Sequence, residues 1–312
     1  MAHTGGALTK SQWLGFFALC ALWSSAWLIS DRWPSPLPPV EQQGLHDLLI
    51  AAVLCCVGWK NLAPGNLRAR PWLKLALASI CLLGVPALVV ETTLGAGSAV
   101  TVAALFALLP VMVVVLVASL GGIGASGAMR LLLPALIGLG GMLLLLPFAE
   151  PGSWRMAGLE AAVVAGIFVA AVASVWMYRL LPGFTVIEAA VICCLANAVF
   201  SAAVLAASSV AARAVISSGW SGWRGLAMEA ATAILVGLPQ ALLLVWLLRG
   251  VAPVRFAARY LVVPLLTVLE AYALLRPPIG LREIGGAVLV IFAAWRLLTA
   301  SQRDEEPGLM LR

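Results

Sequence analysis

Carboxylates inside apolar segments are the side chains of this sequence with the clearest chemical potential. Glu270 lies well inside the apolar run 255–275, and Glu91 lies near the end of the run 72–95. An ionisable group at the depth of a bilayer costs free energy unless it is paired or hydrated, so such residues are candidates for function. We hypothesise that Glu270 binds a solute or exchanges a proton, and that Glu91 converges on it. The alternatives are a structural partner of an arginine or hydroxyl for Glu270, and a wetted interfacial position for Glu91.

Aromatic and amide side chains form a second group of candidates. They could stack on an aromatic or cationic solute, although packing inside the protein is the alternative explanation. An amide that follows a helix-breaking proline, as Gln240 does, can bond either a freed backbone group or a ligand. The aromatic candidates that lie deeper than the segment ends are Trp23, Trp27, Trp176, Trp246, Tyr260 and Tyr272.

Prolines interrupt several of the apolar segments. Each proline removes one helix hydrogen bond, and loosened helices at mid-bilayer depth are where transporters place binding sites. A simple packing kink is the alternative at each position. The prolines concerned are Pro86, Pro110, Pro134, Pro239 and Pro264.

The elements that must position these residues follow from composition. Of the 312 residues, 63% are apolar and 10% are charged, and the mean hydropathy is +1.06. Soluble domains carry about 25% charged residues, so this chain is predicted to lie in a membrane. Lipid offers the backbone no hydrogen-bond partners, and long runs rich in Leu and Ala favour helices over a barrel. We predict an all-α protein with ten transmembrane helices, at 12–30, 44–60, 72–95, 97–119, 129–147, 157–180, 185–208, 225–248, 255–275 and 281–299.

The positive charges predict the topology. When the 19 Lys and Arg residues are assigned to alternate sides of the membrane, most fall on the side of the two termini. The positive-inside rule therefore predicts cytoplasmic termini, in a bacterial-type inner membrane, with residues 301–312 as a cytoplasmic tail. The charges are dispersed, so the net charge of +6 is not taken as a sign of nucleic-acid binding.

Several function classes lack their characteristic residues. The six cysteines lie in apolar runs without the spacing of a metal or disulfide framework, and no cofactor is expected. The two histidines, His3 and His46, lie outside the span centres, and no hydrolase or nucleotide-binding motif is present. An intramembrane enzyme, a channel and a structural membrane protein remain as alternatives to a carrier.

The two halves of the chain resemble each other in order. An odd number of spans per half inverts the second copy, and inverted repeats are typical of secondary transporters. We therefore predict a five-helix repeat at 1–150 and an inverted one at 151–300. The matching segments are 51–56 (AAVLCC) with 189–194 (AAVICC), 84–86 (GVP) with 237–239 (GLP), and 108–110 (LLP) with 262–264 (VVP).

These features resemble the EamA-like branch of the drug/metabolite transporter (DMT) superfamily. The first span contains Trp23 followed by small residues, Pro110 and Pro264 follow apolar stretches, and 281–290 (LREIGGAVLV) resembles the family's last-span motif. The chain departs from the Leu-Gly-Glu motif of many members, because 119–122 and 274–277 read SLGG and LLRP.

The resemblance implies ten helices, cytoplasmic termini and a central cavity lined by spans 1, 3, 4, 6, 8 and 9. It also implies export of amino acids, metabolites or drug-like solutes. The expected function is secondary transport of a small organic solute by alternating access, with proton coupling through Glu270. The candidate binding residues are Glu270, Glu91, Trp23, Trp27, Gln240, Tyr260 and Tyr272. The expected partners are the solute, protons and the lipid bilayer.

Overall fold

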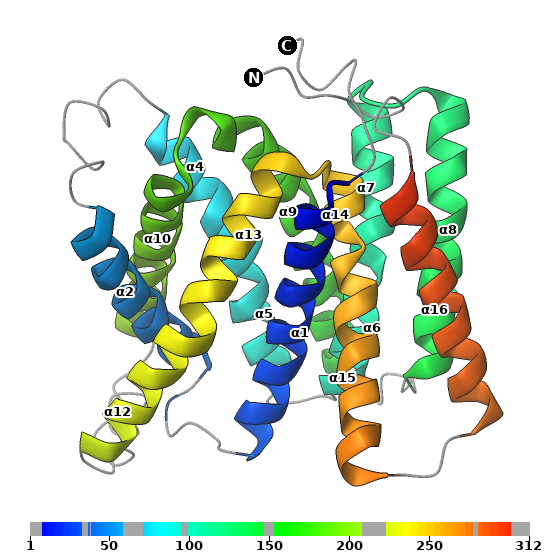
Figure 1. Cartoon of the computed structure of the whole chain (residues 1–312). Helices are drawn as coiled ribbons and strands as arrows, with labels where there is room; N and C mark the ends of the chain where they lie inside the picture. Colours follow the sequence, from blue (N-terminus) through cyan, green and yellow to red (C-terminus); the bar gives the residue numbers. More distant parts are fainter. Residues whose placement is uncertain are drawn as a thin grey trace.

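The computed structural model describes residues 8–32, 37, 39–58, 71–94, 99–146, 153–207, 223–276 and 280–300. The described residues form helices joined by turns, with no β-strand among them. The helices pack side by side as a bundle, and α1 (Lys10–Arg32) begins at the same end of the bundle at which α16 (Leu281–Thr299) ends (Figure 1).

The first half of the chain continues from α1 with α2 (Pro39–Gly58) and with two interrupted helices. The first of these consists of α4 (Trp72–Ser79), the π-helix η1 (Ile80–Gly84) and α5 (Val85–Leu94). The second consists of α6 (Ala99–Phe106) and α7 (Leu108–Ser119), and α8 (Ala125–Leu145) follows.

The second half begins with α9 (Trp154–Leu180), the short 3₁₀ helix η2 (Leu181–Gly183) and α10 (Val186–Ala207). Two interrupted helices follow here as well. They are α12 (Trp223–Thr232) with η3 (Ala233–Gly237) and α13 (Leu238–Gly250), and then α14 (Pro253–Ala257) with α15 (Arg259–Leu275), before the final α16.

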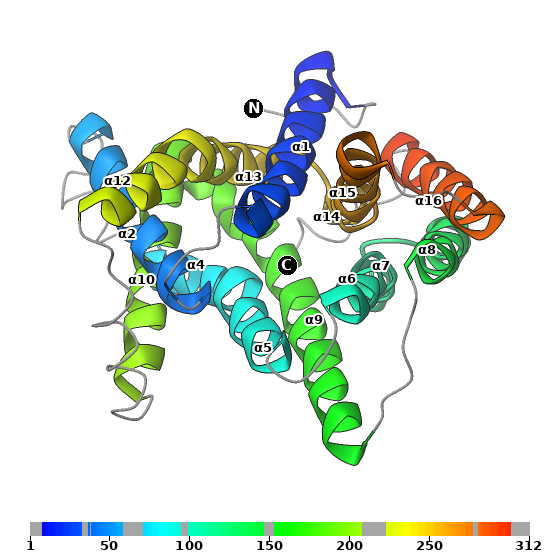
Figure 2. The same ribbon diagram turned by 90° about the horizontal axis from the view of Figure 1, so that it is seen from below.

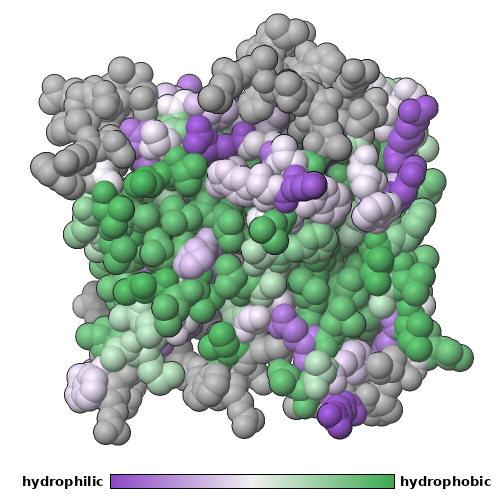
Figure 3. Space-filling view, viewed as in Figure 1, coloured by the Kyte–Doolittle hydropathy of each residue, from purple (hydrophilic) through white to green (hydrophobic). Residues whose placement is uncertain are grey.

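All ten apolar segments of the sequence coincide with helical stretches, and eight of these stretches are long and apolar enough to cross a bilayer. The helices α1 and α16, of 23 and 19 residues, lie outside that set. In the space-filling view the hydrophobic residues form a band across the middle, with hydrophilic residues mainly towards the two ends (Figure 3). These features indicate an integral, multi-pass membrane protein.

Two helix pairs flank the bundle. Helix α2 packs along α10, and α8 packs along α16. Seen from below, these pairs lie on opposite sides, and the remaining helices lie between them (Figure 2). Helix α1 contacts α13 and α15, while α9 contacts α5 and α7.

Small residues allow the close approach of α8 and α16, as is common between membrane helices. A Cβ atom added to Gly286 would lie 2.6 Å from the Leu145 nitrogen and 2.7 Å from the Gly141 carbonyl oxygen. The two backbones are therefore in direct contact at this point.

The two π-helices explain how prolines fit inside long helices. Pro86 and Pro239 each lack an N–H and would clash with the carbonyl four residues earlier, which belongs to Leu82 or Leu235. Both carbonyls lie within the five-residue π segments, whose wider turn accommodates the ring. The sequence pointed to kinks at these prolines. In the structure, the distortion takes the form of a single π-helical segment that ends just before each proline.

Side chains cap the starts of α9 and α10. Ser153 accepts a hydrogen bond from the Met156 backbone nitrogen at 3.3 Å at the start of α9. At the start of α10, Glu188 accepts from the Thr185 backbone nitrogen, while the Thr185 hydroxyl accepts from the Glu188 nitrogen. This reciprocal pair is a capping box.

Candidate functional site

The carboxylate of Glu270 contacts two serines of α1. The hydroxyl of Ser24 lies 2.6 Å from Glu270 Oε1, and the hydroxyl of Ser25 lies 3.4 Å from the same oxygen. Ser24 is fully buried. The second carboxylate oxygen, Oε2, is also buried and has no hydrogen-bond partner among the described residues. Glu270 therefore retains an unused acceptor in the interior of the bundle.

The Ser24 hydroxyl has two possible acceptors but only one hydrogen. It lies 3.1 Å from the Ala21 carbonyl oxygen and 2.6 Å from the carboxylate. When Glu270 is ionised, Ser24 donates to it, because a charged acceptor gives the stronger bond. When Glu270 is protonated, the carboxyl group can donate to Ser24, and the serine hydrogen can turn to Ala21. The contact accommodates both protonation states without moving a helix.

A second ionisable group on α15, Arg259, lies in an aromatic environment. Its guanidinium carbon is 3.8 Å from the ring centre of Phe256, 4.5 Å from that of Tyr260 and 5.2 Å from that of Trp23. One guanidinium nitrogen donates to the Tyr260 hydroxyl at 2.8 Å. Cation–π contacts of this kind offset part of the cost of removing an arginine from water.

Arg259 is 1% exposed, and its Nε has no hydrogen-bond partner among the residues that the structure describes. Within the described part of the chain, no carboxylate lies within ion-pair distance of this guanidinium. A buried cation without an anionic partner is costly, so Arg259 can accept an anionic group from elsewhere.

The two charged residues of α15 face the same neighbour. They are eleven residues apart, which is close to three helical turns and about 16 Å along the axis. Arg259 reaches Trp23 of α1, and Glu270 reaches Ser24 of α1. A cation and a carboxylate thus point at one short segment of α1 from opposite ends.

Two residues of α13 hold the other side of α1. The amide of Gln240 donates to the Leu22 carbonyl oxygen at 2.8 Å. The indole of Trp246 lies so close to Gly15 that an added Cβ would be 2.4 Å from it. Gln240 therefore positions α1 through the backbone of that helix.

The predicted aromatic residues occupy different settings. Trp23 and Tyr260 take part in the Arg259 cluster, and Tyr260 also stacks on Phe106 with ring centres 5.8 Å apart. The carbonyl of Tyr272 accepts from the Arg276 nitrogen at the end of α15. Trp27 belongs to α1, but its side chain lies outside the described residues.

Glu91 and Glu270 bind different helices. Glu91 Oε2 accepts a hydrogen bond of 2.8 Å from the Val40 nitrogen, in the first turn of α2. A carboxylate there favours the helix because it pairs an unsatisfied N–H and the positive end of the helix dipole. This contact gives Glu91 a capping role, and the described part of the chain contains no shared partner for the two carboxylates. Of the other prolines, Pro110 is the third residue of α7 and Pro264 lies within α15.

Sequence reasoning missed Arg259, which was counted only as a topology charge near the start of a span. A signal was available in the stretch 252–264, where Arg255 and Arg259 stand four residues apart in an otherwise apolar run. It also set His46 aside, yet the imidazole Nε2 of this residue lies 2.7 Å from Glu229 Oε2.

The fold has a solved counterpart. A structure described only as "Crystal structure of protein" superposes with a TM-score of 0.72 over 92% of this chain and 97% of that chain, at 20% identity. At this identity the likeness shows a shared fold. No known protein-family profile matches the chain, and no curated protein matches it.

Proposed function

We propose that this chain is a secondary transporter of the EamA-like branch of the DMT superfamily. It moves a small organic solute across a bacterial-type inner membrane by alternating access, in the direction of export. In this proposal α1 and α16 also span the bilayer, which gives ten helices with both termini in the cytoplasm.

Paired features of the two halves support an inverted repeat. Each half carries a five-residue π-helix that ends in a glycine two residues before a proline. Gly84 faces Phe200 and Asn197 of α10, and Gly237 faces Ile50 of α2. Helices α2 and α10 are the second helices of their halves, and each contacts the π-helix of the other half. The contacts of α1 with α13 and α15 likewise correspond to those of α9 with α5 and α7.

The observation that carries the proposal is the pair of incompletely bonded charged groups on α15 that contact α1, of which Arg259 is buried and Glu270 is half-buried with its Oε2 atom buried. Arg259 Nε and Glu270 Oε2 each lack a hydrogen-bond partner among the described residues. Charges at this depth cost about 3 kcal/mol each when unpaired, and they are typical of substrate and proton pathways. A solute with an anionic group would offset this cost at Arg259, and the N-terminal end of α15 favours the same charge.

Glu270 supplies the proton step. Its contact with Ser24 is compatible with both an ionised and a protonated carboxyl group, because the Ser24 hydroxyl can donate either to the carboxylate or to the Ala21 carbonyl oxygen. If Glu270 takes up a proton from the more acidic side of the membrane and releases it on the other side, the proton gradient is coupled to movement of the solute. The π segments before Pro86 and Pro239 lie where helices can bend as access alternates.

The test is a solute-jump experiment on the purified full chain in liposomes. Phenylalanine, glutamate, lysine and benzoate are applied separately, and charge movement is recorded on a solid-supported membrane between pH 5.5 and 8. We expect a saturating response to at least one anionic or zwitterionic probe. Glu270→Gln should remove its pH dependence, and Arg259→Gln should raise the half-saturation concentration at least tenfold.

Glu283→Gln is the matched control, because this carboxylate lies in the first turn of α16, away from α1. It should behave as the wild type. The proposal is wrong if no probe gives a saturating response from folded protein, or if Glu270→Gln retains the wild-type pH profile.

A further inference from the structure

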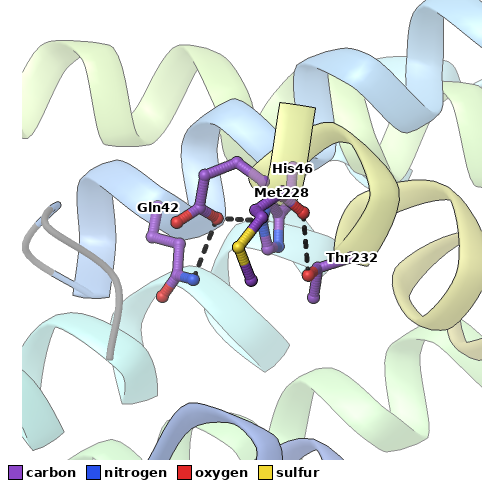
Figure 4. Close-up of polar contacts among 5 residues, drawn as sticks. Gln42, His46, Met228 and Thr232 are labelled. Atoms are coloured by element: carbon purple, nitrogen blue, oxygen red, sulfur yellow. Dashed lines mark hydrogen bonds and ion pairs between the residues drawn. The ribbon is translucent and has the colours of Figure 1, made fainter. Parts of the chain in front are cut away.

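A second polar cluster lies between α2 and α12, apart from the α1–α15 site. The carboxylate of Glu229 accepts from the Gln42 amide at 3.0 Å and lies 2.7 Å from His46 Nε2 (Figure 4). Glu229 is 7% exposed, so its charge is largely removed from solvent. Gln42 and His46 are four residues apart on α2, which places both donors on the same helix face.

The cluster joins α2 to a helix segment that has a weak connection to the rest of its span. Helix α12 has ten residues and is followed by the π-helix η3 and then by Pro239. Helix α12 packs mainly on α2 and η3. It leans on α2 and lies away from α1 (Figures 1 and 2). A π turn and a proline lower the resistance of a helix to bending, so α12 can pivot at η3.

The corresponding place in the first half has no ionisable pair. Ala76 lies four residues before η1, as Glu229 lies four residues before η3. There, α4 is joined to α10 by the Asn197 amide, which donates to the Ser79 hydroxyl at 2.8 Å. Amide and hydroxyl groups do not titrate between pH 5 and 8, whereas imidazole does. Of the two contacts, only the one between His46 and Glu229 contains a side chain of the type that changes charge in that range.

Other titratable groups near the cluster face other elements. Asp47 accepts from Gln43 at 3.1 Å and lies beside the Cys194 thiol of α10. Glu91 of α5 binds the Val40 nitrogen and lies near Glu41. The segment η3 (AILVG) contains no titratable side chain. On α12, Arg224 lies one turn before Glu229, and its side chain lies outside the described residues.

We propose that the His46–Glu229 pair is a proton-sensitive latch that holds α12 against α2. Protonated His46 forms a charge-assisted bond to the Glu229 carboxylate, which is about twice as strong as the bond from a neutral donor. Protonation of His46 therefore tightens the latch, and loss of that proton loosens it. The latch acts on the conformation of the protein and does not require a bound solute, so it goes beyond the proposed transport function.

Hydrogen–deuterium exchange followed by mass spectrometry tests the latch in the full chain in lipid nanodiscs. After correction for intrinsic exchange, peptides that cover 223–232 in the wild type should exchange about fivefold faster at pH 8 than at pH 6, because the difference between a charged and a neutral hydrogen bond corresponds to a factor of this order. His46→Gln keeps a neutral donor and should make this exchange independent of pH. Glu229→Gln should do the same.

Asp47→Asn is the matched control, since this neighbouring carboxylate faces α10, and it should keep the wild-type pH response. Peptides of α8 and α16 report on global folding and should exchange alike in all variants. Equal protection of 223–232 at the two pH values in the wild type, or a persistent pH response in His46→Gln, would overturn the latch. If exchange of 223–232 depends on pH but no solute drives a current, only the transport proposal is contradicted. If solutes drive a current but exchange of 223–232 does not depend on pH, only the latch is contradicted.

Discussion

Replacing Gly286 with alanine should separate α8 from α16. The added Cβ would lie 2.6 Å from the Leu145 nitrogen, 2.7 Å from the Gly141 oxygen and 3.0 Å from the Leu145 Cα. Ordinary contacts of a Cβ are 3.4–4 Å. All three neighbours are backbone atoms, so no side chain can turn away, and the helices must move apart by several tenths of an ångström.

The expected size of the effect follows from two opposing contributions. Overpacking of this kind costs about 1–3 kcal/mol. Alanine is also favoured over glycine inside a helix by about 1 kcal/mol, which partly hides the clash. Gly285→Ala separates the two contributions, because Gly285 has the same helical position within one residue and nothing within 4 Å of its added Cβ. The difference between the two variants is therefore the cost of the clash, about 1–3 kcal/mol.

The assay is thermal unfolding of the purified protein in one detergent, with both variants measured beside the wild type. We expect Gly285→Ala to match or exceed the wild-type Tm and Gly286→Ala to fall several degrees below it. Equal Tm values for the two variants would refute the reasoning, since they would mean that the two backbones are not in contact at Gly286.

Three further predictions concern polar contacts and the kinked helices. Ser24→Ala should change the pH dependence of solute-driven current more than Ser25→Ala, because its hydroxyl is 2.6 Å rather than 3.4 Å from the carboxylate; recordings between pH 5.5 and 8 check this. Asn197→Ala should lower stability by about 1–3 kcal/mol, because it leaves buried polar partners unsatisfied; urea unfolding in mixed micelles measures the loss. Pro239→Ala should restore an α-helical hydrogen bond and slow exchange of the amides of 233–240, which exchange mass spectrometry records.

The sequence was informative wherever the physical constraint was local. Long apolar runs located the helical stretches, because a backbone in lipid must bond to itself. The prolines at 86 and 239 marked the two long helices that contain a π turn, although no residue pattern distinguishes a kink from a π turn. Glu270 was found because a carboxylate deep in an apolar run is conspicuous.

The contacts that define the site depend on distant partners. Glu270 meets Ser24 across 246 residues of chain, and His46 meets Glu229 across 183. Arg259 gains its meaning from aromatic rings on α1, α14 and α15. A single sequence does not show which distant residues come together in space. An arginine that binds aromatic rings at the start of a span therefore looks the same as one that only sets the orientation of the helix in the membrane.

The same long separations bear on how the protein is made. Helix α1 leaves the ribosome first, and α15 follows almost at the end of synthesis. The serines of α1 and the rings around Arg259 can therefore meet their partners only after nearly all other helices have been inserted. The contact of α1 with α15 can therefore form only late in synthesis, and a chain cut short before residue 259 would leave its first helix without this neighbour.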